Sequence, residues 1–401
     1  MLLIREEDFG GFVFNTRNGS RVSLDDEGFK AFETLVSDRK KLRDEEVAFL
    51  EGICGRLELA KKEHFSLINV PKKTTKAYPF EVYRSPVLLD LQITTRCNLF
   101  CPHCYVNSSA SGQDASLEDI TKVFDQAQEA GVFEIALGGG EPTLHPHFET
   151  ILKECDRRHI VPNLATNGCD LSNAHIKAMK RYCGAVALSL EHLGVKFEKR
   201  RGYAFSQFLD SVQRLKRENI QVVFQVTVSQ SNLSELADIA KFLVTFEPYG
   251  IVFLTFKPVG RAICYDTPLS KVDIHEIVPV IKACFFFLEG KTKVGYDCCL
   301  ANALIGTGVS NDCEIQGCSA LRTSIAVNWN LDIVPCSFSA QVVGNLNQTK
   351  LIDVWNGDQA ALFRERFQSK VESQDRCKSC TFKWTCLGGC PEFNLVSCTK
   401  S

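Results

Sequence analysis

From residue 88 onward, short apolar runs alternate with segments whose apolar residues recur at helical spacing. The runs at 88–93, 133–137, 162–165, 185–189, 220–228 and 251–256 predict strands, and the segments at 116–127, 148–157, 205–216 and 233–246 predict helices. Apolar strands of this length that are separated by helices are typical of a buried parallel sheet. Six such units predict an α/β fold, a partial (β/α)6 TIM-type barrel, with its active site at the carboxyl ends of the strands.

The first 80 residues follow a different pattern. Apolar runs at 12–14 and 21–24 flank the polar segment 15–19 and predict a β-hairpin, and helices are expected from Asp25 or Asp26 and over 44–61. A hairpin followed by short helices indicates a winged-helix-like module. No helix in it is markedly basic, so we expect no nucleic-acid partner, because such a partner needs a face rich in Lys and Arg.

Unusual polar and glycine motifs follow the predicted barrel strands. Cys97, Cys101 and Cys104 come after the first strand. The later motifs are Gly-Gly-Gly-Glu-Pro at 138–142, Thr-Asn-Gly at 166–168, Ser-Leu-Glu at 189–191 and Lys-Pro-Val-Gly-Arg at 257–261. Because the carboxyl ends of barrel strands meet at one edge, we expect these motifs to converge. Three thiolates on a [4Fe–4S] cluster leave one iron open, and an open metal position is where a substrate or cofactor binds.

The composition indicates a soluble protein of the cytoplasm. Of 401 residues, 45% are hydrophobic and 23% are charged, and the net charge of −2 provides no general attraction to nucleic acid or to an anionic membrane. We expect no membrane span, because no uncharged apolar run reaches about 18 residues. Charged residues directly after residue 4 argue against a secretory signal. The 19 cysteines indicate metal or redox chemistry rather than disulfides.

The first cysteine motif, together with the Gly-Gly-Glu-Pro that follows the second strand, resembles the radical S-adenosylmethionine (SAM) enzymes over roughly residues 85 to 260. The resemblance implies a [4Fe–4S] cluster on Cys97, Cys101 and Cys104 whose open iron chelates SAM. It also implies that a 5′-deoxyadenosyl radical, released from SAM, abstracts a hydrogen from the substrate.

The same resemblance implies a set of residues around SAM. Gly138, Gly139 and Gly140 lack a Cβ, so that backbone can approach the methionyl group, and Glu141 can pair with its ammonium. The other positions are His103 beside the adenine, Ser189 toward the methionyl or ribose end, Arg201 at the carboxylate, and the weaker candidates Thr166 and Asn167. Arg200 is an equally available neighbour of Arg201, and Thr-Asn-Gly is also typical of a simple turn. No spacing selects a catalytic base among Glu191, Lys257 and Asp297.

The last hundred residues resemble the SPASM extension of this superfamily, which carries two auxiliary [4Fe–4S] clusters, so we expect three clusters in all. The resemblance implies that the first auxiliary cluster uses Cys318, Cys336 and Cys390, with Cys313 as the fourth ligand unless Cys298 or Cys299 replaces it. It implies that the second uses Cys377, Cys380, Cys386 and Cys398. The SPASM pattern has glycine where this chain has Leu331, and we expect the turn there to form with Asn330 in the left-handed region.

These resemblances predict three domains and a class of substrate. The domains are a leader-peptide recognition module over 1–80, the radical SAM barrel over 85–295 and the SPASM domain over 296–401. SPASM enzymes mostly modify peptides, and the N-terminal module looks like the domain that binds a leader peptide as an added strand. We therefore expect a maturase that removes a hydrogen from a ribosomally made precursor peptide and closes a carbon–carbon or thioether crosslink, with a flavodoxin or ferredoxin as electron donor.

Several alternatives stay open at this point. A sulfatase-maturing type of enzyme, which oxidises Cys or Ser to formylglycine, would share the barrel and the SPASM part but leave the N-terminal module unexplained. A peptide epimerase would use the same sites. A non-enzymatic alternative is an iron–sulfur or zinc protein that only binds a partner. Four protein ligands on the first auxiliary cluster would leave no vacancy for a substrate thiolate and so favour a carbon–carbon bond.

Overall fold

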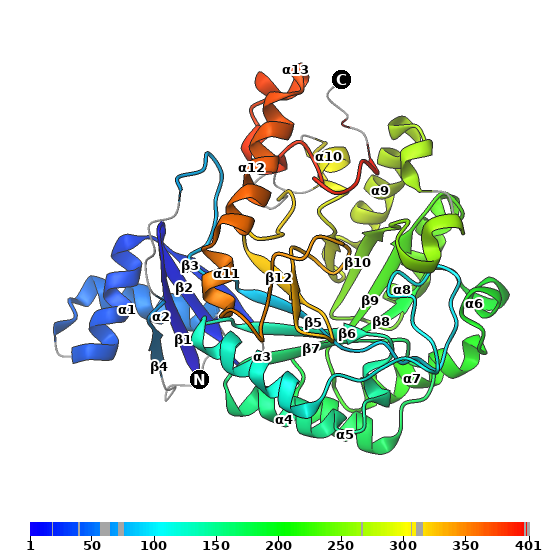
Figure 1. Ribbon diagram of the computed structural model, residues 1–401, viewed down its shortest axis with the longest axis horizontal. Helices are drawn as coiled ribbons and strands as arrows, with labels where there is room; N and C mark the ends of the chain where they lie inside the picture. The colour runs from blue at the N-terminus through cyan, green and yellow to red at the C-terminus, as the bar shows by residue number, and fades with distance from the viewer. Residues whose placement is uncertain are drawn as a thin grey trace.

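Figure 1 shows the computed structural model of residues 1–401, which describes the chain except residues 18, 39–40, 57–64, 71–75, 266–267, 306, 310–315, 397 and 399–401. The described part forms two sheets. A four-stranded sheet has the order β3-β2-β1-β4, and a ten-stranded sheet has the order β11-β10-β9-β8-β7-β6-β5-β12-β13-β14. Within the described ranges, no helix has the length and apolar character needed to cross a membrane.

The N-terminal unit builds the smaller sheet. It comprises β1 (Leu2–Glu7), β2 (Gly10–Asn15), β3 (Arg21–Leu24), α1 (Asp26–Asp38), α2 (Asp44–Arg56) and β4 (Phe65–Ile68). The predicted hairpin corresponds to β2 and β3, which pair antiparallel. β1 and β4 are not among the predicted elements; β1 pairs with β2, and β4 lies parallel to β1 at one edge. The predicted end of the second helix at residue 61 lies outside the described residues.

The barrel alternates strands and helices as predicted. Its elements are β5 (Leu88–Thr94), α3 (Leu117–Glu129), β6 (Glu134–Gly139), the 3-10 helix η2 (Pro142–Leu144), α4 (Phe148–Arg157), β7 (Val161–Thr166), α5 (Asn173–Tyr182), β8 (Val186–Leu190), α6 (Gly194–Arg201), α7 (Phe205–Arg217), β9 (Val222–Val228), η3 (Leu233–Glu235), α8 (Leu236–Val244), β10 (Gly250–Thr255), η4 (Gly260–Cys264), η5 (Leu269–Lys271), α9 (Ile274–Leu288), β11 (Lys293–Tyr296) and α10 (Ala301–Leu304). The six predicted strands are β5 to β10, and each pairs parallel with the next.

The C-terminal part extends this sheet instead of forming a separate body. Its elements are β12 (Ser324–Val327), β13 (Asp332–Val334), β14 (Gly344–Asn345), α11 (Leu351–Trp355), α12 (Asp358–Glu372), α13 (Asp375–Lys378) and α14 (Lys383–Cys386). β12 pairs parallel with β5 at one end of the six strands, and β11 pairs parallel with β10 at the other. Both added strands have only four residues, which is too short for apolar periodicity to identify them.

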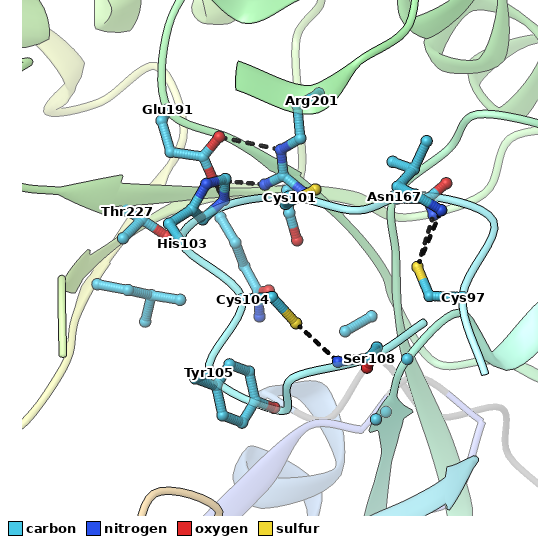
Figure 2. A pocket seen from close by; sticks show the side chains of 18 of the residues that line it. Cys97, Cys101, His103, Cys104, Tyr105, Ser108, Asn167, Glu191, Arg201 and Thr227 are labelled. Carbon is cyan, nitrogen blue, oxygen red and sulfur yellow. Dashed lines mark hydrogen bonds and ion pairs between the residues drawn. The ribbon is translucent and has the colours of Figure 1, made fainter. Parts of the chain in front are cut away.

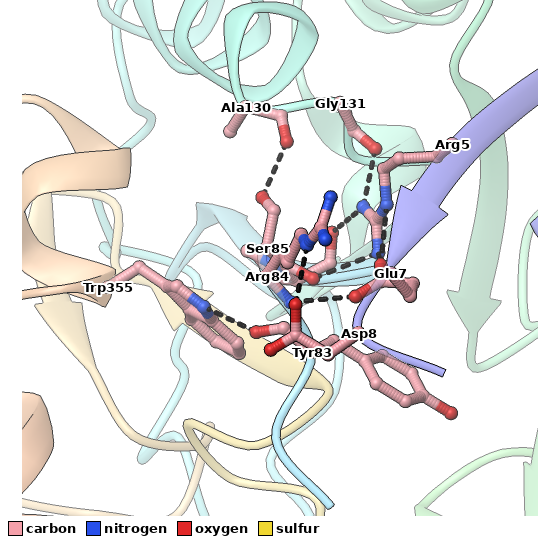
Figure 3. A network of polar contacts seen from close by, with 10 residues as sticks. Arg5, Glu7, Asp8, Tyr83, Arg84, Ser85, Ala130, Gly131 and Trp355 are labelled. Carbon is pink, nitrogen blue, oxygen red and sulfur yellow. Dashed lines mark hydrogen bonds and ion pairs between the residues drawn. The ribbon is translucent and has the colours of Figure 1, made fainter. Parts of the chain in front are cut away.

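The N-terminal sheet is docked on the barrel through a buried contact (Figure 3). The aromatic ring of Phe14 stacks on that of Phe133, with centroids 4.8 Å apart. Arg5, fully buried, bonds to Glu7 Oε1 and donates from Nη1 to the carbonyl of Gly131 at 2.7 Å. It also donates to the carbonyls of Ser85 and Pro86. The N-terminal unit therefore shares a core with the barrel.

Candidate active site

The loop after β5 presents three thiols at the carboxyl end of the barrel sheet (Figure 2). Cys97, Cys101 and Cys104 line one pocket together with glycines from β6 and polar residues from β7 and β8. The sulfur of Cys97 accepts from the N–H of Leu99 at 3.4 Å, and that of Cys104 accepts from the N–H of Ser108 at 3.5 Å. N–H donors aimed at sulfur favour the thiolate, which is the form that binds iron.

Burial works against that thiolate until a metal binds. It raises the pKa of the Cys97 thiol to about 11 despite the bond from Leu99, and it raises the pKa of the Cys101 thiol despite the charge of Arg201. A buried thiol of this kind releases its proton when it coordinates a metal. The three thiols, with donors at two of their sulfurs, fit the iron–sulfur cluster that the motif predicts.

The three predicted glycines line the pocket, but they are required for different reasons. A Cβ on Gly138 would meet no atom within 4 Å, so this position leaves space for a ligand. A Cβ on Gly139, whose φ is +117°, would lie 2.1 Å from the carbonyl oxygen of Thr94, and one on Gly140 would lie 2.1 Å from that of Arg96. The prediction from sequence is that all three allow close approach to SAM; the group that approaches Gly139 is the end of strand β5, and the group that approaches Gly140 is the start of the cysteine loop.

Glu141 organises the loops on either side of it. Its Oε1 accepts from the hydroxyls of Thr143 and Thr166 and from the N–H of Thr143, and its Oε2 accepts from the N–H of Asn167 at 2.8 Å. Burial raises its pKa in spite of these bonds. Glu141 is not among the residues that line the pocket, but Oε2 retains one lone pair. Its predicted pairing with an ammonium stays a prediction.

The Thr-Asn-Gly segment serves both as a turn and as a wall of the pocket. Asn167 Oδ1 accepts from the N–H of Cys169 at 2.8 Å, and the N–H of Gly168 donates to the hydroxyl of Thr166. Asn167 Nδ2 also donates to Asn98 Oδ1 at 2.9 Å and lies 3.8 Å from the sulfur of Cys97. Thr166 and Asn167 both line the pocket, as does Ser189.

Glu191 connects the cysteine loop to the end of β8 (Figure 2). Its carboxylate lies 3.0 Å from His103 Nε2 and accepts from two nitrogens of Arg201, with Nε at 2.9 Å. Although burial raises the pKa of Glu191, the charges of Arg201 and His103 hold it well below its usual range, so Glu191 stays ionised. From the sequence, only the position of Glu191 at the end of a predicted strand placed it near the site. Ser189 and Glu191 are two residues apart and therefore face the same side of that strand, which is the pattern that pointed to Glu191.

The geometry separates the two candidate arginines. Arg201 lines the pocket, whereas the guanidinium of Arg200 lies 5.1 Å from the ring centroid of Tyr265 and donates to Ser231. The side chain of His103 is 8% exposed, and its Nδ1 has no partner among the residues that the structure describes. A buried ring nitrogen left without a partner in a pocket wall fits a bound ligand with a polar edge, such as the adenine of SAM.

A fixed cation lies on the other side of the pocket. Lys257 Nζ lies 2.5 Å from Asp297 Oδ2 and 3.1 Å from the carbonyl of Thr255, over the ring of Phe338 at 4.5 Å. Burial lowers the pKa of Lys257, but the charge and hydrogen bond of Asp297, together with the nearby thiols of Cys298 and Cys299, raise it overall, so the ammonium keeps its proton. No signal in the sequence pointed to Phe338 or to Tyr105, whose rings lie 4.5 Å apart on the pocket wall.

A second group of thiols lies where β11 ends. Hydrogen bonds join Cys298 to Cys299 and to Cys318, and join Cys390 to Cys299 and to Cys318. The bonds from Cys299 and Cys318 lower the pKa of the Cys390 thiol. Burial raises the pKa of the Cys336 thiol to about 11, with a smaller contribution from the nearby Cys390 thiol. Three cysteines are candidates for the fourth ligand of the first auxiliary cluster. Cys313 lies outside the described residues, whereas Cys298 and Cys299 lie beside the predicted ligands Cys318 and Cys390.

The remaining predicted ligands lie near the C-terminus. Burial raises the pKa values of the Cys377 and Cys386 thiols, and nearby thiols raise them further: those of Cys398 and Cys380 for Cys377, and those of Cys398 and Cys377 for Cys386. The sulfur of Cys386 donates to Asn302 Oδ1 at 2.9 Å. Within the described ranges, no three His, Cys, Asp or Glu side chains are arranged to hold a single metal ion.

The turn before Cys336 differs from the prediction. Leu331 itself has φ +68°, whereas Asn330 does not appear among the residues with positive φ. The leucine side chain is 2% exposed. Burial of that side chain compensates for a backbone conformation that costs a non-glycine residue about 1–2 kcal/mol.

Comparison with known proteins places this site in a family. The Radical SAM superfamily matches residues 91–243, and the Iron-sulfur cluster-binding domain named SPASM matches residues 318–381. The mycofactocin maturase MftC of Mycobacterium ulcerans is 23% identical over 322 residues, covering 76% of this chain and 83% of its own. The AdoMet-dependent heme synthase of Methanosarcina barkeri is also 23% identical, covering 76% of this chain and 91% of its own.

Solved structures share the fold. Streptococcus suis SuiB bound to SAM matches 100% of this chain and 98% of its own, with a TM-score of 0.72 and 18% identity. SuiB bound to its precursor peptide SuiA matches 97% of this chain and 94% of its own, with a TM-score of 0.69 and 17% identity. The protein anSMEcpe with AdoMet and the Cp18Cys peptide matches 78% and 93%, with a TM-score of 0.58 and 19% identity.

The fold and the thiol-lined pocket thus define an iron–sulfur enzyme that uses SAM. The chain belongs to the radical SAM superfamily and carries a SPASM domain.

Proposed function

We propose that this protein is a peptide maturase that removes a hydrogen from a ribosomally made precursor peptide and closes a carbon–carbon or thioether crosslink in its core. One observation carries the proposal: a three-thiol pocket, two further thiol groups and a sheet with a free edge occur in one body. The fold match to SuiB, which has been solved with a precursor peptide, extends over the whole chain and so includes that sheet.

The cysteines divide into three proposed ligand sets. The first is Cys97, Cys101 and Cys104. The second is Cys318, Cys336 and Cys390, for which we propose Cys298 or Cys299 as the fourth ligand because their thiols contact those of Cys318 and Cys390. The third is Cys377, Cys380, Cys386 and Cys398. The described cysteines are free, as a reducing compartment such as the cytoplasm keeps them. When bound, SAM and a reduced cluster supply a 5′-deoxyadenosyl radical that takes one hydrogen atom from the substrate.

The pocket residues bind and orient rather than exchange protons. Arg201, held by Glu191, presents a guanidinium that suits the carboxylate of SAM, and His103 Nδ1 suits a polar edge of the adenine. Lys257 holds a positive charge on the opposite wall. Because its ion pairs lower the pKa of Glu191 and make it a weak proton acceptor, and because Lys257 is already protonated, we propose neither as the base that accepts the substrate proton during crosslinking.

The leader peptide would bind at the free edge of the N-terminal sheet. Among the described residues β3 pairs only with β2. The backbone groups of Asn15 point toward β3, because its carbonyl accepts from the N–H of Gly19. Along an antiparallel pair, successive residues point their backbone groups alternately toward and away from the partner strand. The register therefore leaves the N–H groups of Arg21 and Ser23 pointing away from the sheet. An extended peptide can add a strand to those two residues. Phe49 of helix α2 is 40% exposed and lies next to Gly28 of α1, the helix that follows β3.

Two variants test the leader site without disturbing the buried docking of the N-terminal sheet. Ser23→Pro removes an outward-facing donor, which edge strands tolerate, and Ser23→Ala keeps it. Leader binding, measured by fluorescence anisotropy with a labelled leader peptide, should fall at least tenfold in Ser23→Pro only, while SAM cleavage under dithionite is unchanged in both. Equal leader affinity in the two variants would reject the proposed site.

The catalytic assignment has its own test. In anaerobically reconstituted protein we expect about twelve irons per chain from three [4Fe–4S] clusters. The combined substitution Cys97→Ala, Cys101→Ala and Cys104→Ala should remove about a third of the iron and abolish formation of 5′-deoxyadenosine. Mass spectrometry of the product then separates the chemistries: a crosslink removes a pair of hydrogens and resists reduction, epimerisation leaves the mass unchanged, and formylglycine forms a hydrazone. Zinc in place of iron would refute the assignment.

A further inference from the structure

The loop after β10 crosses the mouth of the partial barrel and contacts the cysteine loop. β5 and β10 are the first and last of the six barrel strands and are separated by β6 to β9, so no ladder of strand hydrogen bonds joins their ends. Nevertheless Gly260 and Arg261, at the start of η4, touch six residues of the loop that follows β5. The contact spans 160 positions of sequence between Arg261 and Cys101.

Gly260 allows the two backbones to approach. Its φ is +63°, and a Cβ there would lie 2.4 Å from the carbonyl oxygen of Tyr105 and 2.8 Å from that of Cys104. Both obstructing atoms are backbone, so no side-chain movement would relieve the clash. Only glycine combines this left-handed conformation with this distance.

Arg261 binds the cysteine loop at several points. Its N–H donates to the carbonyl of Cys104 at 3.0 Å, and its Nε donates to the carbonyl of Cys101 at 3.1 Å. Nη1 donates to the carbonyl of Ser108 at 2.5 Å and to Asn107 Oδ1 at 3.2 Å. The guanidinium carbon lies 3.9 Å from the ring centroid of Phe100, which is itself 70% exposed. The guanidinium of arginine has several N–H donors in one plane and can bind several carbonyls at once, which the single ammonium of lysine cannot match in this geometry.

We propose that Gly260 and Arg261 form a clamp that closes the open barrel above the pocket and sets the position of the three thiols relative to the opposite wall. Apart from the clamp, the cysteine loop is anchored on the β6, β7 and β8 side, through Glu141, Asn167 and Glu191, and no other hydrogen bond between described residues joins it to the β10 connection. Lys257 precedes Gly260 on the same connection, so the clamp also fixes the distance between the thiols and that cation. Arg261 is thus a positioning residue, which acts through the loop rather than on the substrate.

The clamp can be tested in protein without iron, where only the loop itself is measured. Arg261→Lys keeps the charge but loses the fork, and Gly260→Ala forces the loops apart. In metal-free protein we expect iodoacetamide to label Cys101 and Cys104 about tenfold faster in either variant than in the wild type, as followed by mass spectrometry. Cys155, which is fully buried on the inner face of α4, is the internal reference and should label at the same rate in all proteins.

The reconstituted enzyme provides a second readout. Arg214→Lys is the matched control, since Arg214 also bridges to a backbone carbonyl, that of Leu171, but lies away from the cysteine loop. In Arg261→Lys, but not in Arg214→Lys, we expect SAM to bind about tenfold more weakly and to change the electron paramagnetic resonance spectrum of the reduced cluster less than in the wild type. Auxiliary iron should be retained in both, which shows that the variants fold.

The clamp is wrong if Arg261→Lys labels at the wild-type rate and binds SAM with wild-type affinity while folded. It is also wrong if the labelling rate of Cys155 rises together with those of Cys101 and Cys104, because the whole barrel has then loosened. Since neither labelling nor SAM binding requires a peptide, failure here leaves the proposed maturase activity untouched, and failure of that activity leaves the clamp standing.

Discussion

Removal of Arg5 should separate the N-terminal sheet from the barrel. Arg5 and Glu7 are an ion pair whose side chains are 0% and 1% exposed. Arg5 also donates three hydrogen bonds to backbone carbonyls, those of residues 85 and 86, which precede β5, and that of Gly131. Arg5→Met leaves the carboxylate of Glu7 buried without its cation. Breaking a buried pair in this way costs about 3–5 kcal/mol, which is a factor of roughly a hundred to several thousand in an opening equilibrium.

Hydrogen exchange of the backbone amides of β1 and β2 measures that equilibrium locally, without global unfolding of a metalloprotein. Protection in Arg5→Met should fall by this factor. The double variant Arg5→Met with Glu7→Gln should recover about 1 kcal/mol or more, because no buried charge remains. The control Arg157→Met removes an ion pair to Glu154 whose arginine is 66% exposed, and it should change protection by less than about fivefold. A loss of less than about tenfold in Arg5→Met would refute the reasoning.

Three further outcomes follow from single positions. Leu331→Gly should be more stable than Leu331→Ala by about 1 kcal/mol in thermal unfolding, the reverse of the usual order, because φ is +68° there; a more stable alanine variant would contradict this. Gly138→Ala should weaken SAM binding and leave stability unchanged, whereas Gly139→Ala should lose stability and iron, because its Cβ would lie 2.1 Å from a carbonyl oxygen; calorimetry and iron analysis distinguish the two, and identical behaviour would reject the distinction. Burial lowers the pKa of His145, whose Nε2 lies 2.9 Å from the carbonyl of Ala115. The unfolded chain therefore binds a proton on His145 more readily than the folded chain does. The stability that comes from burying neutral His145 is fully present above about pH 6.5 and is lost as the pH falls below it. His145→Gln should reduce the fall in melting temperature between pH 7 and pH 5.5, and parallel curves would count against the assignment.

The barrel could be predicted because its information is local. Short apolar runs separated by helical segments identified β5 to β10, and the segment predicted from residue 116 became α3, which Ser116 caps by accepting from the N–H of Asp119. Four-residue strands such as β4, β11 and β12 have too few positions to show a period, and the partners that stabilise them lie far away in sequence. These strands form because each pairs with the edge strand of a sheet.

The strand-end pattern and the family resemblance together predicted which residues gather at the pocket, but not how they interact. The cysteine loop, the three glycines, Thr166, Asn167, Ser189 and Arg201 all line it. The ion pair between Arg201 and Glu191, which distinguishes Arg201 from Arg200, depends on how α6 packs against the end of β8. The same holds for Cys298 and Cys299, which reach the SPASM thiols only because β11 extends the barrel sheet.

The sequence by itself determined the chemistry of this protein: three thiols at one spacing, a glycine motif after the next strand, and a parallel barrel that brings both to one edge. Those features depend on neighbours along the chain and on the fixed direction of parallel strands. Tertiary structure alone decided what surrounds the thiols. The contacts of Glu191, Lys257 and Arg261 join elements that are far apart in sequence, and their geometry follows from the packing of whole strands and helices, which no local pattern records.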